Sequence, residues 1–280
     1  MGKIKIVTDS TCDISKEEAR DLQIHIIPLS ITIDGETYLD RVDISPKAFL
    51  EKMKASVELP KSSQPAVGEF VELYNRLAED GSDIISIHMT GRMSGTVEAA
   101  RTAAAMANAN VTVIDSLFIS KALAYQVRKA ALMAKEEQET AQIVAEITDI
   151  KEKSRLFVVV DTLENLVKGG RIGKGKAMIG SLLNIKPIAM LEAGEYSPVA
   201  KVRSHSQGVK YLAKQFIEDI KGKTLKSVSI VHADGLDFAL KLKNEIQGAA
   251  HPVSVEVDDT TPVISTHTGP GAIGFMYWAE

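Results

Sequence analysis

Residues 84–96 read Ile-Ile-Ser-Ile-His-Met-Thr-Gly-Arg-Met-Ser-Gly-Thr, an apolar strand that runs into a loop of hydroxyls and glycines. An alanine-rich helix over 97–107 follows, so its free backbone N–H groups and the positive end of its dipole face the loop. Ser94 and Thr96 add hydroxyl donors, and Gly95 keeps a side chain out of the way. The stretch predicts either an anion-binding strand–loop–helix unit or an ordinary helix start capped by one of the hydroxyls.

Short apolar strands alternate with helical patterns on both sides of this unit, up to about residue 150. Such alternation is typical of a parallel sheet covered by helices. The predicted strands lie at 4–7, 24–29, 84–88 and 111–114, and the predicted helical stripes at 70–77, 123–134 and 143–150. We therefore expect an α/β fold whose N-terminal domain is built on a parallel sheet.

The charged run at 151–155 is the clearest boundary in the chain. We expect one α/β domain over 1–154 and a second over 155–280, with the alternative that the last strand packs back on the first domain. Strands of the second half are predicted at 156–160, 227–231, 253–257 and 262–266, and helices at 209–220 and 238–246. Their less regular alternation indicates a separate α/β layer.

Composition narrows the class of protein. The 280 residues are 45% hydrophobic and 25% charged, and this length alone favours two domains. A net charge of -4 with 5% aromatic residues argues against nucleic-acid binding, which needs clustered Lys and Arg. No apolar run approaches the roughly 20 residues that cross a bilayer, so we expect no stable membrane insertion. One cysteine and an N-terminus without a signal-like apolar region favour a cytoplasmic location.

Three familiar motifs are nearly present. Residues 170–177 have P-loop spacing, but Ala177 stands where the magnesium-binding Ser or Thr is required. The glycines of 269–274 follow the dinucleotide pattern, but too little chain remains for the helix and second strand of that fold. Residues 91–95 resemble a nucleophile elbow whose serine is displaced by one position. Nucleotide binding and serine hydrolase chemistry are both disfavoured.

Metal and thiol chemistry have no better support. The histidines include no pair at the spacing of about two to five residues that metal sites use. The thiol of Cys12 lies beside Asp13 and near Asp9, whose negative charges raise its pKa and oppose activation. We expect neither a metal nor another cofactor, and we interpret Cys12 as a small buried or capping residue.

Four loops remain, each rich in hydroxyls or glycine and each following an apolar or extended segment. They lie at 8–13, 61–65, 90–96 and 266–271. The last one carries His267, predicted at the end of a strand, and two of the others carry Ser62 and Ser94. Hydroxyls, backbone N–H groups and one histidine suit a carboxylate or a phosphate, and they supply no strong base.

Five short motifs follow one another along the chain. They are Thr-Asp-Ser-Thr-Cys-Asp at 8–13, Ser-Ser-Gln-Pro at 62–65, Ser-Gly-Thr at 94–96, Gly-Gly-Arg-Ile at 169–172 and His-Thr-Gly-Pro-Gly-Ala at 267–272. Their order and spacing resemble the DegV family over almost the whole length. The resemblance implies a two-domain DegV-like fold, with a parallel-sheet N-terminal α/β domain and a second α/β domain with a mixed sheet.

The same resemblance implies a function. Members of the family hold one long-chain fatty acid in an apolar tunnel between the domains, and the FakB subunits of bacterial fatty acid kinase belong to it. A separate kinase subunit then phosphorylates the carboxylate to an acyl phosphate. We expect this chain to be such a lipid-binding subunit and not an enzyme. Its ligand would be palmitate-like, and its partner the cognate catalytic subunit.

Site residues follow from the motifs, one by one. The resemblance assigns the carboxylate contacts to Ser62, Ser94 and His267. Ser62 replaces a threonine of the family, which keeps the hydroxyl and loses a methyl group, and Met93 stands where many relatives have a second serine. The supporting loop residues implied are Ser63, Gly95, Thr96, Thr268 and Gly269. The residues implied at the pocket mouth or in kinase contact are Arg203, Arg171 and Lys176.

Two other functions stay open on the residues alone. Ser94 as nucleophile and His267 as base would make an acyl hydrolase, for which a third group is missing. Alternatively, the loops could sense a small anion such as a sugar phosphate. A fatty acid of some 16 carbons gains about 0.8 kcal/mol per buried methylene, so an apolar tunnel would hold it with few polar contacts.

Overall fold

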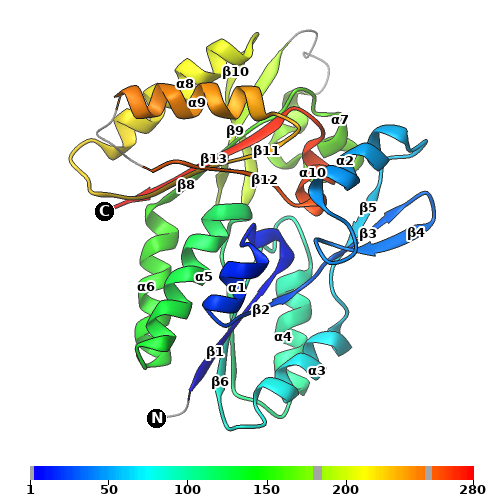
Figure 1. The fold of residues 1–280 in the computed structure, drawn as a ribbon, viewed down its shortest axis with the longest axis vertical. Helices are drawn as coiled ribbons and strands as arrows, with labels where there is room; N and C mark the ends of the chain where they lie inside the picture. Colours follow the sequence, from blue (N-terminus) through cyan, green and yellow to red (C-terminus); the bar gives the residue numbers. More distant parts are fainter. Residues whose placement is uncertain (1–2, 179–184, 250–253) are drawn as a thin grey trace.

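The computed structural model describes residues 3–178, 185–249 and 254–280. Its first layer is a four-stranded parallel sheet with the strand order β2-β1-β6-β7 (Figure 1). The strands are β1 (Ile4–Asp9), β2 (Ile24–Ile27), β6 (Asp83–His88) and β7 (Val111–Asp115). They are short apolar runs because a parallel sheet is covered on both faces. The four strands predicted for this half are confirmed, with small differences at their ends.

Helices cover both faces of this sheet. One face carries α3 (Val67–Leu77) and α4 (Thr96–Met106), whose small and aromatic side chains share a core with β1 and β6. The other face carries α5 (Ser120–Lys135), with α6 (Thr140–Lys153) beside it. The short α1 (Lys16–Asp21) precedes β2, and a 3₁₀ turn, η1 (Ser10–Cys12), follows β1. The predicted helical stripes at 70–77, 123–134 and 143–150 are confirmed.

A small antiparallel sheet projects from this layer, with the strand order β4-β3-β5. It consists of β3 (Ser30–Ile33), β4 (Glu36–Leu39) and β5 (Lys61–Ser63), and α2 (Pro46–Ala55) joins β4 to β5. This sheet was not among the predicted elements, and its strand β5 reads Lys-Ser-Ser, which has no apolar alternation. Pairing of Ser62 with Ile31 of β3 fixes the position of the Ser62 loop.

The second layer is a six-stranded mixed sheet with the order β10-β9-β8-β13-β11-β12. Its strands are β8 (Ser154–Val159), β9 (Lys186–Glu192), β10 (Glu195–Val202), β11 (Leu225–Ala233), β12 (Glu256–Asp259) and β13 (Ala272–Ala279). Only β11 and β12 pair in parallel. The outer face is covered by α8 (His205–Ile220) and α9 (Leu236–Ala249), which confirms the helices predicted at 209–220 and 238–246.

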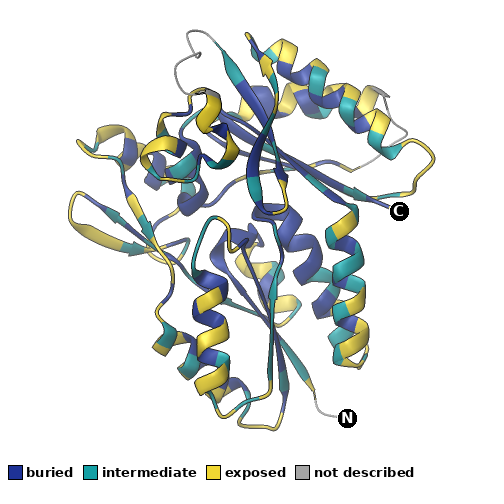
Figure 2. Cartoon of the chain, turned by 180° about the vertical axis from the view of Figure 1, so that it is seen from behind, coloured by how far each residue is buried: buried dark blue, intermediate teal, exposed yellow. Residues whose placement is uncertain are grey.

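The inner face of the second sheet packs against α5, which therefore lies between the two layers. Figure 2 shows α5 buried along most of its length, while α8 and α9 expose their outer faces. The Tyr125 hydroxyl of α5 lies within hydrogen-bond distance of two acceptors, Ser229 Oγ of β11 at 2.9 Å and the Met276 carbonyl of β13 at 3.1 Å. The boundary expected after residue 154 lies at the junction of α6 and β8.

The prediction of a strand at 262–266 is wrong, because this segment forms the helix α10 (Pro262–Thr268). Its β-branched residues favour a strand in isolation. The helix start is nevertheless well formed, since Thr261 Oγ1 accepts the Ile264 N–H and Pro262 occupies the first turn. His267 therefore lies at the end of a helix and not of a strand.

The remaining differences concern the glycine-rich segments. The strand expected at 253–257 begins at Glu256 as β12, and residue 253 lies outside the described residues. The glycines of 269–274 lead into β13, which lies between β8 and β11 and also contacts α5 and α6. The P-loop-like residues 170–177 follow α7 (Glu164–Lys168) and enter the 3₁₀ turn η2 (Gly173–Met178), so no strand precedes them directly.

Candidate functional site

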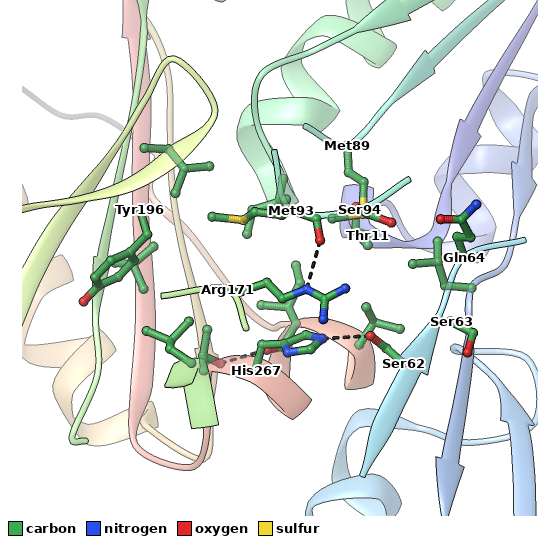
Figure 3. Close-up of a pocket in the computed structure, with 18 residues that line it drawn as sticks. Thr11, Ser62, Ser63, Gln64, Met89, Met93, Ser94, Arg171, Tyr196 and His267 are labelled. Atoms are coloured by element: carbon green, nitrogen blue, oxygen red, sulfur yellow. Dashed lines mark hydrogen bonds between the residues drawn. The ribbon is translucent and has the colours of Figure 1, made fainter. Parts of the chain in front are cut away.

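A cavity of about 290 Å³ lies where the loops of the first sheet meet β5, α10 and the second sheet (Figure 3). Its polar lining residues are Thr11, Ser62, Ser63, Gln64, Ser94, Arg171, His267 and Thr268. The rest of the lining is apolar or aromatic and consists of Leu29, Met89, Met93, Ile119, Val158, Leu166, Leu191, Tyr196, Val263 and Ile264. An apolar chamber with a few convergent polar groups is typical of a small-molecule site.

The apolar part of the cavity continues inward. A smaller cavity of about 20 Å³ shares Ile119, Val158, Ile264 and Thr268 with the main one and reaches Met276 of β13. Its lining is almost entirely hydrophobic, because it lies where α5 packs against the second sheet. The two cavities together form an apolar path that starts at the polar groups and points into the interior.

Ser62 of β5 and His267 of α10 meet at the polar end of the cavity. The Ser62 Oγ and His267 Nε2 atoms are 2.7 Å apart, although the residues are 205 positions apart in the chain. Burial, together with the nearby Arg171 charge, lowers the pKa of His267 to about 4, so the imidazole is neutral at pH 7. A neutral ring has one N–H and one acceptor nitrogen.

The surroundings of the second ring nitrogen, Nδ1, indicate the tautomer of His267. Nδ1 is buried and has no hydrogen-bond partner among the described residues. Buried N–H groups are left without a partner more rarely than buried acceptors, so we place the proton on Nε2 and leave Nδ1 as the unpartnered acceptor. His267 Nε2–H then donates to Ser62 Oγ, which leaves the Ser62 hydroxyl proton free to donate to a ligand in the cavity.

Ser94 enters the cavity from the loop before α4. Its Oγ lies 2.8 Å from Thr96 Oγ1 and accepts the Thr96 N–H at 3.3 Å. Gly95 is the N-cap residue of α4, and it makes no side-chain capping bond. Ser94 lines the cavity, whereas Gly95 and Thr96 do not. The helix dipole of α4 adds a favourable field for an anion at this end.

The loop at 8–13 anchors the helix that carries His267. Asp13 accepts the Thr261 N–H at 2.9 Å and the Thr260 hydroxyl at 3.0 Å, both at the start of α10. Asp40 accepts the Ser10 hydroxyl at 2.7 Å and a longer bond from the Val263 N–H at 3.4 Å. Burial raises the pKa of both carboxyls, that of Asp40 to about 7. The first layer therefore positions α10.

Only Thr11 of the loop at 8–13 lines the cavity, so most of this loop is structural. Cys12 is fully buried, and burial, followed by the charges of Asp9 and Asp13, raises the pKa of its thiol to about 12. A thiol in this state is not a nucleophile at neutral pH. The interpretation of Cys12 as a small buried residue is confirmed.

Arg171 lies inside the cavity lining, beside His267, and not merely at the mouth (Figure 3). Its Nε donates to the Met93 carbonyl at 2.9 Å, and its Nη1 donates to the Gly169 carbonyl. The first of these bonds holds the guanidinium against the Ser94 loop, and burial lowers its pKa while leaving it cationic. It is the one cation among the eighteen lining residues.

Other residues expected near the site take different positions. Thr268 and Ser63 line the cavity, and Gly269 ends α10 with a positive φ of 76°. Arg203 and Lys176 are exposed and do not line it. The sequence analysis did not select Thr11 or Gln64, although both belong to loops that it identified. The apolar lining comes from segments spread over the chain, so no local pattern predicts it.

Among the described residues, no group of three or more His, Cys, Asp or Glu side chains is placed to hold a metal ion. Within the same residues, no helix is long and apolar enough to cross a membrane.

The fold and the cavity define a two-layer α/β protein with a small-molecule chamber between its layers. Comparison with known proteins identifies the family. The model described as "Uncharacterised protein, DegV family" matches residues 3–280. A DegV domain-containing protein of Staphylococcus aureus is 44% identical over 276 residues, which cover 99% of both chains. The chain belongs to the DegV family.

Solved structures agree with this assignment. A crystal structure of DegV from Bacillus subtilis, described as a fatty acid binding protein, superposes with a TM-score of 0.92 at 33% identity over 100% of both chains. A DegV family protein from Thermus thermophilus, described by its fatty acid binding, gives a TM-score of 0.94 at 29% identity over 99% of this chain and 100% of that one. The two-domain DegV-like fold expected from the motifs is confirmed.

Proposed function

We propose that this protein binds one long-chain fatty acid, with the acyl chain in the apolar part of the cavity and the carboxylate at its polar end. The observation that carries the proposal is the Ser62–His267 hydrogen bond at the polar end of a chamber whose remaining lining is mostly apolar. The relatives described as fatty-acid-binding proteins support the same ligand class.

The head group would be held by neutral donors and one cation. Ser62 and Ser94 offer hydroxyl protons, and Arg171 offers a positive charge from within the lining. A neutral His267 acts as a donor to Ser62 and adds no second charge. Charge-assisted hydrogen bonds to a carboxylate are about twice as strong as neutral ones, so this set fixes the orientation of the ligand.

Affinity would come mainly from the acyl chain. Each buried methylene contributes about 0.8 kcal/mol, so a chain of some 16 carbons gains far more from the apolar lining than from its head group. The path past Ile119, Val158 and Ile264 toward Met276 is the direction in which the methyl end would lie. Loss of one polar contact should therefore weaken presentation of the head group more than binding of the ligand.

We further propose that the bound carboxylate is presented to a separate kinase subunit, which converts it to an acyl phosphate. Phosphoryl transfer needs one carboxylate oxygen within reach of the partner. Ser63 and Gln64, which are exposed and also line the cavity, mark the side on which the head group is nearest to solvent. The exposed Arg203 and Lys176 are candidates for contact with that partner.

The test compares variants of the head-group contacts. Ser94→Ala and His267→Ala should keep the fold, retain most of the affinity for palmitate and slow acyl-phosphate formation by the cognate kinase about tenfold or more, which corresponds to about 1.4 kcal/mol or more. Thr102→Ala removes an exposed hydroxyl on the outer face of α4 and serves as the control.

Three results would contradict the proposal in different ways. Unchanged rates in both variants would contradict the assignment of the head-group residues. Turnover of a simple ester without a partner would favour a hydrolase, and a polar ligand in place of a lipid would favour a small-anion sensor.

A further inference from the structure

Gln64 reaches from the end of β5 onto the Ser94 loop. A Cβ atom added to Gly95 would lie 2.1 Å from Gln64 Oε1, 3.0 Å from Cδ and 3.2 Å from Nε2. No real side chain tolerates the first of these distances, so the Gln64 carboxamide occupies the space directly over Gly95. Figure 3 places Gln64 at the same end of the cavity as Ser94.

The backbone does not require a glycine at position 95. Its φ is -76° and its ψ is 7°, which any L-residue adopts without strain. The three atoms nearest to an added Cβ all belong to Gln64. The Gln64 carboxamide therefore fills the space that glycine leaves free. Because it is the end of a flexible side chain, it can also move away from Gly95.

The carboxamide has capacity to bind a ligand. Gln64 is exposed and lines the cavity, and its amide group makes no hydrogen bond to any of the described residues. It stands next to Ser62 and Ser63 in the chain and over the Ser94 loop in space, so it spans two walls of the polar end. A primary amide offers two N–H donors and no charge.

We propose that the Gln64 carboxamide is a latch over the carboxyl end of the ligand. In the closed position, seated on Gly95, it donates an N–H to a carboxylate oxygen and covers the head group from solvent. When it swings off Gly95, the head group is uncovered for release or for a partner. This inference rests on the proposed fatty-acid binding and adds the residue that sets the lifetime of the complex.

The test measures the dissociation rate of a fluorescent polyene C18 fatty acid, displaced by excess palmitate, from the wild type and from four variants. Gln64→Ala removes the latch, and Gly95→Ala displaces it from its seat. Each should raise the dissociation rate about tenfold, because the carboxyl end of the ligand can then leave the cavity without the latch opening first.

The double variant Gln64→Ala/Gly95→Ala decides the mechanism. If Gly95→Ala acts only through Gln64, the double variant should dissociate no faster than Gln64→Ala alone. Gly68→Ala, which adds a methyl group in open space, is the matched control and should leave the rate unchanged. Thermal unfolding of each variant checks that Gly95→Ala keeps the fold. If Gly95→Ala does not fold, Gln64→Ala still tests the latch, because it changes an exposed side chain.

Two results would overturn the latch. One is a wild-type rate in Gln64→Ala, and the other is a Gly95→Ala effect that persists undiminished in the Gln64→Ala background. Absence of binding by the wild type would instead contradict the proposed function, so the two failures are distinguishable.

Discussion

Two serine–histidine pairs among the described residues have the same separation and opposite surroundings. Ser62 Oγ and His267 Nε2 are 2.7 Å apart at the polar end of the cavity. Ser86 Oγ and His88 Nε2 are also 2.7 Å apart, but they lie on β6 in the interior of the first layer, where both side chains are fully buried.

The buried pair belongs to a longer chain of hydrogen bonds. The Tyr74 hydroxyl lies 2.8 Å from Ser86 Oγ, and His88 Nδ1 lies 3.1 Å from Asp9 Oδ2. Burial alone would raise the pKa of Asp9. Its hydrogen bond and ionic interaction with His88, aided by donors from Thr11 and Met89, give a net lowering. Serine, histidine and aspartate are thus all present where no ligand can reach.

The Ser62–His267 pair lacks a carboxylate that corresponds to Asp9. His267 Nδ1 has no acceptor among the described residues, and the pKa of the ring is lowered to about 4. A catalytic histidine needs a carboxylate on this nitrogen to hold its tautomer and stabilise the charged form. The hydrogen bond of His267 also goes to Ser62, and not to Ser94 as the hydrolase hypothesis required. The comparison teaches that the Ser62–His267 pair lacks the carboxylate that the buried serine and histidine have, which favours our proposal of a binding site over the hydrolase hypothesis.

The largest expected effect comes from removing Asp9, the carboxylate bonded to the histidine of the buried pair. Asp9→Ala leaves His88 and the backbone N–H groups of Thr11 and Met89 without their acceptor. Removal of one partner from such a buried pair destabilises by about 3–5 kcal/mol. Urea denaturation should show this loss, whereas His267→Ala should cost about 1 kcal/mol or less. Equal losses in the two variants would remove the distinction between a structural and a binding pair.

A second prediction uses the pKa of His267, which is lower in the folded protein than the ordinary value of 6.5. The unfolded chain therefore binds this proton more tightly, and stability that is present above pH 6.5 is lost as the pH falls toward 4. The loss from this one group is about 2–3 kcal/mol. Urea denaturation at pH 7 and pH 4.5 should show a smaller loss in His267→Gln than in the wild type.

The comparison with His267→Gln is needed because Asp40 acts in the opposite direction. Its pKa is raised to about 7 in the fold, so its contribution to stability is present at low pH and is lost as the pH rises through that value. Asp40 is present in both proteins, so its contribution cancels when the pH dependence of stability in His267→Gln is subtracted from that of the wild type. An identical pH dependence in both proteins would mean that His267 is not the buried neutral imidazole described above.

The smallest expected effect concerns Ser62→Thr. Threonine keeps the hydroxyl that meets His267 and adds one methyl group at a half-buried position. One buried methylene is worth about 0.8 kcal/mol, so the affinity for palmitate should rise by no more than about fourfold. Ser62→Ala is the matched control, because it removes the hydroxyl. A large loss of affinity in Ser62→Thr would show that the size of the side chain, and not its hydroxyl, governs this position.

Much of the first layer follows from local sequence patterns. Apolar runs and helical stripes are properties of single segments, so β1, β6 and α5 could be predicted. The strand β5 could not, because its polar residues are held by pairing with β3. The helix α10 was mistaken for a strand, because its β-branched residues outweighed the Thr261 cap and the proline that follows it.

The site divides in the same way. Ser94 was found because strand, loop and helix adjoin in the sequence, and the motifs that resemble the family pointed to Ser62 and His267. No local pattern joins the latter two, which meet only when β5 and α10 pack together. The apolar lining and the Gln64–Gly95 contact depend on side chains from distant elements, so only the folded chain reveals them.

The most direct test of the central claim is mass spectrometry of an organic extract from the purified protein, followed by titration of the stripped protein with palmitate. We predict close to one long-chain fatty acid per chain in the extract, and saturable binding of palmitate that competes with it. An extract without fatty acid, together with no binding of added palmitate, would contradict the account.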